Sequence, residues 1–201
     1  MRIVQEGVSR RDIIESYAKY DFQKKRNSET LPDFDGWNWS SADAIDEELG
    51  RAGLKTGIPA GYLSWNIVQI MIPDFRECAV VGGIFAGQMH RQLGLIEQNG
   101  GLGNWEGKLL QHLGSRPVPL WYDSIKQGVV LDDSAPFLLR PAVFSERPAR
   151  WYVEDGSGRA VTFVANAKAF APLEEVAAGF LGTVPDASSK FMRTHFAELL
   201  R

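Results

Sequence analysis

The feature that most constrains the fold of this 201-residue chain is a glycine turn set between a strand-like segment and a helix-like segment. Residues 150–154 read Arg-Trp-Tyr-Val-Glu, and such a run of aromatic and β-branched residues is typical of a strand. Gly156 and Gly158 follow closely, and the residues from Ser157 to about Lys168 have the composition of a helix. The chain is therefore predicted to run from a strand through a tight turn into a helix.

The segments on both sides of this turn predict a small mixed sheet. Residues 138–144 form a second strand-like run, and residues 145–148 between the two runs have the composition of a turn. The two runs are therefore expected to be adjacent strands. Prolines favour an extended conformation over residues 116–122, and residues 176–181 predict another short strand.

The first part of the chain predicts a different organisation, a mostly helical region over residues 1–115. Two serine–acid pairs fit the capping box that begins a helix, Ser9 with Asp12 and Ser40 with Asp43. Residues 75–98 are expected to contain a long helix, whereas residues 62–72 fit either a helix or a buried strand. We expect an α+β protein with a helical region 1–115 and a mixed region 116–201, as two domains or as one continuous domain.

The composition excludes several classes of protein. A single cysteine, Cys78, makes an intramolecular disulfide impossible, and its apolar neighbours predict a buried thiol. The net charge of −3 provides no general attraction to nucleic acid or to an anionic membrane. The first residues lack the apolar segment of a signal peptide, and no run of about 18 apolar residues predicts a membrane span. A cytoplasmic protein that does not bind a membrane is expected.

The glycine turn is also the best candidate for a binding site. The candidate residues are Glu154, Asp155, Gly156, Ser157, Gly158 and Arg159. Glycines let backbone N–H groups approach a ligand closely, and the amino end of a helix favours an anion. Arg159 adds a cation that matches phosphate, and Glu154 or Asp155 would act as the catalytic base or hold a divalent ion. The same residues also fit an ordinary helix cap in which Arg159 pairs with one of these carboxylates.

This segment resembles the signature of the ParB/sulfiredoxin superfamily, in which a strand ends in a Gly-x-x-Arg turn and a helix with small residues follows. The resemblance covers residues 116–182 and includes strands at residues 119–121 and 140–143. It implies a small mixed sheet with helices that binds nucleoside phosphates, with Gly156 and Arg159 contacting the phosphate. Sulfiredoxins have Gly-Cys-His-Arg where this chain has Gly-Ser-Gly-Arg, so their thiol chemistry is not expected here.

These observations lead to one functional prediction and two alternatives. The leading prediction is a nucleotide- or phosphometabolite-binding protein, acting as a phosphotransferase or phosphohydrolase with a nucleoside phosphate and magnesium. The first alternative is a non-enzymatic regulatory protein whose tryptophan-containing N-terminal half binds a protein partner. The second is nucleic-acid binding or cleavage through a basic patch formed by Arg140, Arg147, Arg150 and Arg159.

The histidines do not suggest a protein-bound metal. They stand at positions 90, 112 and 195, too far apart in the sequence for a close pair of ligands. His195 is expected on the buried face of a final helix that opens at residues 185–186.

Overall fold

The computed structural model describes residues 1–20, 31–54, 59–80, 92–115, 118–129, 136–170, 175–195 and 197. The chain divides into two compact units. The first consists of Met1–Ile3 and Val68–Gly179, and the second of Val4–Ile67 and Phe180–Arg201. Both units therefore combine segments that are distant in the sequence, and residue 115 lies inside the first unit.

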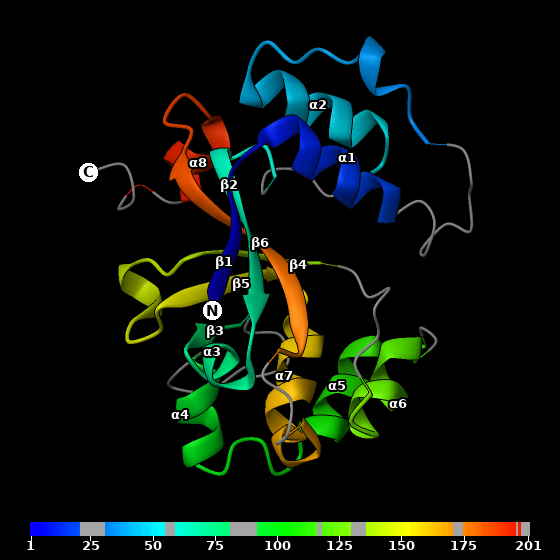
Figure 1. Ribbon diagram of the computed structural model, residues 1–201, viewed down its shortest axis with the longest axis vertical. Helices are drawn as coiled ribbons and strands as arrows, with labels where there is room; N and C mark the ends of the chain where they lie inside the picture. The colour runs from blue at the N-terminus through cyan, green and yellow to red at the C-terminus, as the bar shows by residue number, and fades with distance from the viewer. Residues whose placement is uncertain are drawn as a thin grey trace. The chain divides into compact units, whose positions relative to one another are not determined.

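The described residues contain one mixed sheet of six strands in the order β1-β2-β6-β4-β5-β3 (Figure 1). The strands are β1 (Arg2–Ser9), β2 (Tyr62–Ile70), β3 (Cys78–Ala79), β4 (Phe137–Pro141), β5 (Trp151–Asp155) and β6 (Ala177–Pro185). β4 and β5 are antiparallel, with Leu139 opposite Val153. The short β3 pairs with β5 in parallel, with Cys78 opposite Trp151. The predicted adjacency of the strands on either side of residues 145–148 is confirmed.

Helices account for much of the remaining described chain. The α-helices are α1 (Arg10–Tyr20), α2 (Ala42–Arg51), α3 (Ile72–Arg76), α4 (Leu93–Gln98), α5 (Trp105–Leu113), α6 (Leu120–Lys126), α7 (Ser157–Ala165) and α8 (Lys190–His195). Short 3₁₀ turns lie at Phe34–Gly36, Phe144–Glu146 and Ala167–Phe170. In the described part of the chain, none of the helices has the length and apolar character needed to cross a bilayer.

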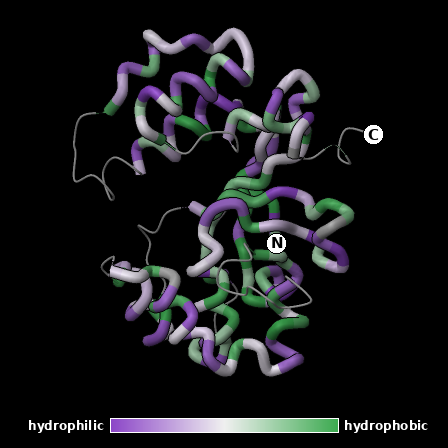
Figure 2. The backbone as a smooth tube through the Cα atoms, turned by 180° about the vertical axis from the view of Figure 1, so that it is seen from behind, coloured by the Kyte–Doolittle hydropathy of each residue, from purple (hydrophilic) through white to green (hydrophobic). Residues whose placement is uncertain are grey.

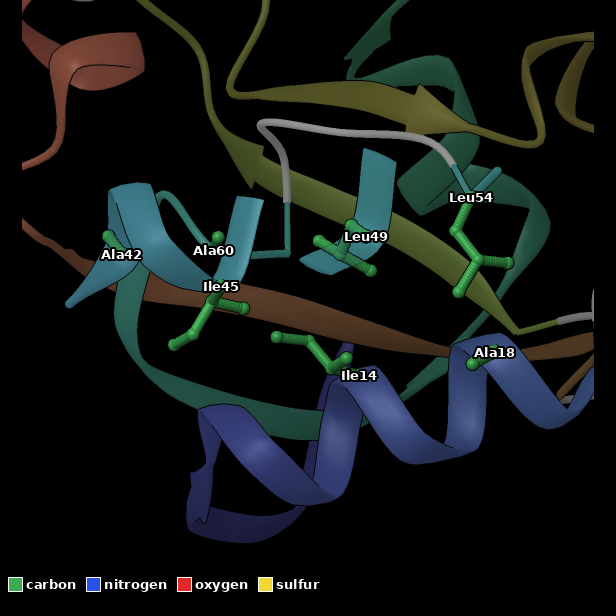
Figure 3. Close-up of a cluster of buried hydrophobic side chains, with 7 residues drawn as sticks. All are labelled: Ile14, Ala18, Ala42, Ile45, Leu49, Leu54 and Ala60. Carbon is green, nitrogen blue, oxygen red and sulfur yellow. The ribbon is translucent and has the colours of Figure 1, made fainter. Parts of the chain in front are cut away.

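The second unit contains a small core between α1 and α2. Figure 3 shows Ile14 and Ala18 of α1 facing Ile45 and Leu49 of α2, and all four side chains are buried. The predicted cap of α1 is confirmed, because the backbone N–H of Asp12 donates to the Ser9 hydroxyl over 3.1 Å. α2 is capped one residue later than predicted. Ser41, rather than Ser40, accepts the hydrogen bond from the N–H of Ala44, again at 3.1 Å.

The first unit is built around an aromatic core that fixes the position of α7. The ring of Phe75 in α3 stacks against Phe163 of α7 at 5.5 Å and contacts Phe137 of β4 at 4.8 Å. Phe163 also contacts Phe170 at 5.1 Å. In Figure 2 hydrophobic and hydrophilic residues alternate along the coiled parts of the tube. The six consecutive residues Arg159–Val164 of α7 are all buried, so the helix is enclosed by its neighbours on every side rather than along one apolar face.

The α+β class is confirmed, but a mostly helical N-terminal half is not. Three strands lie within the first 115 residues, and residues 62–70 form the strand β2 rather than a helix. The long helix expected within residues 75–98 does not include residues 77–80, because α3 ends at Arg76 and Cys78 pairs with β5. Sheet pairing decides the conformation here, since a two-residue strand forms only beside a partner. Residues 81–91 of that prediction lie outside the described residues, as does the side chain of His195.

A second correction concerns the strand expected at residues 119–121. Pro119 has an extended backbone, with φ −65° and ψ 144°, but it stands at the N-cap of helix α6 rather than inside a strand. Tyr122 and Ile125 are buried three residues apart, which places them on the same face of the helix. Proline is compatible with the start of a helix. The extended backbone therefore ends at Pro119, and the helix begins at Leu120.

Candidate functional site

The turn between β5 and α7 requires glycine at position 156. The backbone of Gly156 has φ +101°, in the left-handed region that other residues rarely adopt. A Cβ atom at this position would lie 2.5 Å from Cδ1 of Phe137 and 2.9 Å from Nη2 of Arg159. Gly156 therefore permits both the reversal of the chain and the close approach of two side chains to the backbone.

The N-cap residue of α7 is Gly156, and no side chain among the described residues caps this helix end. The hydroxyl of Ser157 donates to the carbonyl of Val153 over 3.2 Å, and the first turn of the helix has no acidic residue. The first N–H groups of a helix have no partner within the helix and carry partial positive charge. Residues 155–158 are partly exposed, so this positive end lies within reach of solvent.

Arg159 lies beside this helix end, with its side chain only 6 % exposed. Its guanidinium lies over the ring of Phe137, 4.3 Å from the ring centre, and Nη2 donates to the Pro136 carbonyl over 3.5 Å. The same nitrogen is 3.9 Å from Oδ2 of Asp155, whose side chain is 28 % exposed. A buried guanidinium and a helix amino end thus place positive charge around one partly exposed turn, with Asp155 as a nearby carboxylate.

Glu154 has a different environment from Asp155, although the two residues are neighbours in β5. One of its carboxylate oxygens accepts a hydrogen bond from Nε of Arg140 in β4, at 2.5 Å. Arg140 also donates to both carboxylate oxygens of Glu146, at 2.8 and 2.7 Å, and lies over the ring of Tyr152. The structure therefore places Glu154 in a buried ion network and brings Asp155, rather than Glu154, towards Arg159.

The hydrogen bonds and negative charges of this network stabilise the positive charge of Arg140. Burial by itself lowers the pKa of Arg140, but the hydrogen bonds to Glu146 and the negative charges of Glu154 and Glu146 outweigh that effect. The pKa of the guanidinium is raised above its ordinary value as a result. Such a network ties β4, β5 and the Phe144–Glu146 turn together.

Helices α5 and α6 both pack against α7, and Figure 1 shows them on the same side of it. A Cβ atom at Gly158 would lie 3.3 Å from Leu109 and 3.5 Å from the indole of Trp121. Trp121 is half-buried, and its indole lies next to the turn. The sequence did not indicate this neighbour, because residues 119–121 were expected to form a strand.

The four arginines of the expected basic patch divide into two classes. Arg140 and Arg159 are buried, whereas Arg147 and Arg150 are exposed. The structure therefore does not bring all four cations to one surface. Within the described residues, no group of three or more His, Cys, Asp and Glu side chains is placed to hold a metal ion.

Comparisons with protein-family models, with curated proteins and with solved structures found no match for this chain. The turn between β5 and α7 and the side chains around it are therefore the observations that bear on function.

Proposed function

We propose that the chain binds a small phosphorylated ligand at the amino end of α7. The observation that carries the proposal is a partly exposed helix amino end with a guanidinium folded back beside its N-cap glycine. Helix amino ends favour anions through their N–H groups and their partial positive charge, and a nearby arginine strengthens that preference. A phosphate group is the common biological anion that fits both donors.

In this proposal the ligand lies against the first turn of α7. Its phosphate accepts hydrogen bonds from the backbone N–H groups of Ser157 and Gly158, and Arg159 neutralises its charge from the buried side. The half-buried indole of Trp121 next to Gly158 favours a ligand with a flat ring, such as a nucleoside phosphate. The resemblance to the ParB/sulfiredoxin superfamily supports the same class of ligand.

If the ligand reacts, we assign Asp155 as the carboxylate that binds a magnesium ion or transfers a proton. Its side chain is partly exposed, whereas Glu154 is buried against Arg140 and serves to hold the strand. The non-enzymatic alternative is separated from the enzymatic one by Asp155→Asn. An enzyme loses turnover of the ligand in this variant and keeps its binding, whereas a binding protein shows no turnover in either form.

The proposal is tested by thermal-shift titration of nucleoside phosphates and sugar phosphates, with and without magnesium, on three forms of the protein. A ligand that binds only the native state must raise the melting temperature. The matched variants are Ser157→Ala and Ser157→Asp, which both lose the hydrogen bond to Val153. Only Ser157→Asp places a negative charge at the helix end.

We expect Ser157→Asp to be more stable than Ser157→Ala by about 0.3–1 kcal/mol, because a carboxylate interacts favourably with the helix amino end. We also expect Ser157→Asp to weaken binding of the phosphate ligand at least about fivefold, since a like charge within about 4 Å costs about 1–4 kcal/mol in water or near a protein surface. Ser157→Ala should bind close to normally. Equal binding by the two variants would exclude this helix end as the site.

A further inference from the structure

A second candidate site lies at the opposite end of β5, in the loop between β4 and β5. A cavity of about 420 Å³ is lined there by Glu77, Gln92, Arg147, Pro148, Ala149 and Arg150. Two of these six residues are exposed arginines. The cavity is separate from the turn at α7, since none of its lining residues belongs to residues 154–159.

Each of the two arginines of the cavity lies over an aromatic ring. The guanidinium of Arg147 is 5.3 Å from the ring centre of Phe144, and that of Arg150 is 5.4 Å from the ring of Trp151. Phe144 is 73 % exposed, which makes it the most exposed of the large hydrophobic side chains in the described part of the chain. Trp151 is half-buried. Each arginine that lines the cavity thus lies beside an aromatic ring.

A buried ion pair and backbone hydrogen bonds hold the loop that carries these side chains in place. Glu146 is buried and pairs with Arg140, and its Oε2 accepts a hydrogen bond from the N–H of Val143 at 2.9 Å. The N–H of Ala149 donates to the carbonyl of Glu146, and the N–H of Arg150 donates to the carbonyl of Glu77. The loop therefore presents its ring and cations without first having to be ordered, which lowers the entropic cost of binding.

The one acidic residue among those that line the cavity is a weak competitor for a ligand. The carboxylate of Glu77 is 3.5 Å from Nη1 of Arg150, and the two side chains are 49 % and 70 % exposed. Exposed ion pairs of this kind contribute little to stability, so Arg150 can turn to another anion at small cost.

We propose that this cavity and its two rings bind single-stranded nucleic acid. Arg147 and Arg150 contact successive phosphates, and bases stack on the exposed face of Phe144 and beside Trp151. Proteins that bind single strands without sequence preference combine cations along the backbone with aromatic rings beneath the bases. A duplex does not fit this arrangement, because its bases are paired and cannot stack on the side chains.

The proposal is tested with the full chain and a fluorescent single-stranded oligo(dT) of about a dozen nucleotides, a length that covers one binding site of this kind. Fluorescence anisotropy gives the affinity at several salt concentrations. The variants are Arg150→Gln, Phe144→Ala and Phe144→Trp. The control is Arg51→Gln, which removes an arginine of similar exposure, 66 %, from α2.

We expect Phe144→Ala to weaken binding roughly 5- to 100-fold, the range that corresponds to the loss of one stacked base. Phe144→Trp should retain binding because it keeps an aromatic face. Arg150→Gln should reduce the slope of log affinity against log salt by about 0.7, the value for one phosphate contact on a single strand. Arg51→Gln should bind like the unmodified protein.

Three results would overturn the proposal. One is the absence of saturable binding at low salt. Another is binding that Phe144→Ala leaves unchanged and that inorganic phosphate displaces, which would indicate an anion site without stacking. The third is equal affinity for a duplex of the same length. Ser157→Asp should leave oligo(dT) binding unchanged, so failure here and failure at the α7 turn can be told apart.

Discussion

The two ends of β5 carry the same kinds of residue in opposite states of burial. At the carboxyl end, the side chain of Arg159 is 6 % exposed and packs over Phe137. At the amino end, the side chain of Arg150 is 70 % exposed and lies over Trp151. An arginine over an aromatic ring can thus either be buried and support the fold, or be exposed where a ligand can contact it directly.

Arg140 connects the two ends of the strand. From β4 it holds Glu154 near the carboxyl end of β5 and Glu146 in the loop before its amino end. Both candidate sites therefore depend on the same buried cation, and a change at Arg140 is expected to disturb both of them.

The largest expected effect follows from removing this cation. Arg140→Ala removes the buried cation that Glu146 and Glu154 share, and breaking a buried ion pair in this way costs about 3–5 kcal/mol of unfolding free energy. Urea denaturation followed by circular dichroism measures the change. Arg150→Ala is the matched control, because its side chain is exposed and its loss should change stability by no more than about 0.5 kcal/mol. Equal effects of the two substitutions would show that burial does not distinguish the two arginines.

The next effect concerns the glycines of the α7 turn. Gly156→Ala should cost about 2–4 kcal/mol, since it combines a strained backbone with a clash against Phe137 and Arg159. Gly158→Ala adds the same methyl group within the helix, at 3.3 Å from the flexible end of Leu109, and gains helix propensity. Its effect should stay within about 1 kcal/mol. Thermal unfolding of the two variants compares them, and a mild effect of Gly156→Ala would contradict the described turn.

The smallest effect separates the two carboxylates at the end of β5. Asp155→Asn should change the unfolding free energy by less than about 1 kcal/mol, because this carboxylate is partly exposed and 3.9 Å from Arg159. Glu154→Gln should cost about 1.5–3 kcal/mol, as it removes a charged hydrogen bond from buried Arg140. Chemical denaturation of both variants at neutral pH gives the difference. A larger loss at Asp155 than at Glu154 would reverse the roles that we assign to them.

Local patterns in the sequence were sufficient to predict the elements around the turn. The strand at residues 150–154, its neighbour after residue 138 and the helix from Ser157 all have clear signals of composition and turn chemistry. The elements that were predicted wrongly depend on contacts between residues that are distant in the sequence. β3 exists because Cys78 pairs with Trp151, and α6 begins at the point where prolines had suggested a strand.

The sequence was sufficient to predict the turn at the candidate site, but not which charged side chains pair with one another there. The sequence left Arg159 free to pair with either Glu154 or Asp155. The structure assigns Glu154 to Arg140, and the side-chain direction along β5 decides this, since neighbouring residues of a strand face opposite sides. Likewise, four arginines looked equivalent in the sequence, and burial separates Arg140 and Arg159 from the exposed pair in the loop.

The most direct test of phosphate binding at α7 is an NMR titration of the ¹⁵N-labelled protein with inorganic phosphate and then with a nucleoside monophosphate. Backbone amides that donate to a phosphate change their chemical shifts strongly and saturably. The proposal predicts that the amides of Ser157, Gly158 and Arg159 show the largest changes, with the same saturation curve for all three. Shifts confined to the loop that carries Arg147 and Arg150, or no saturable shifts at residues 157–159, would contradict it.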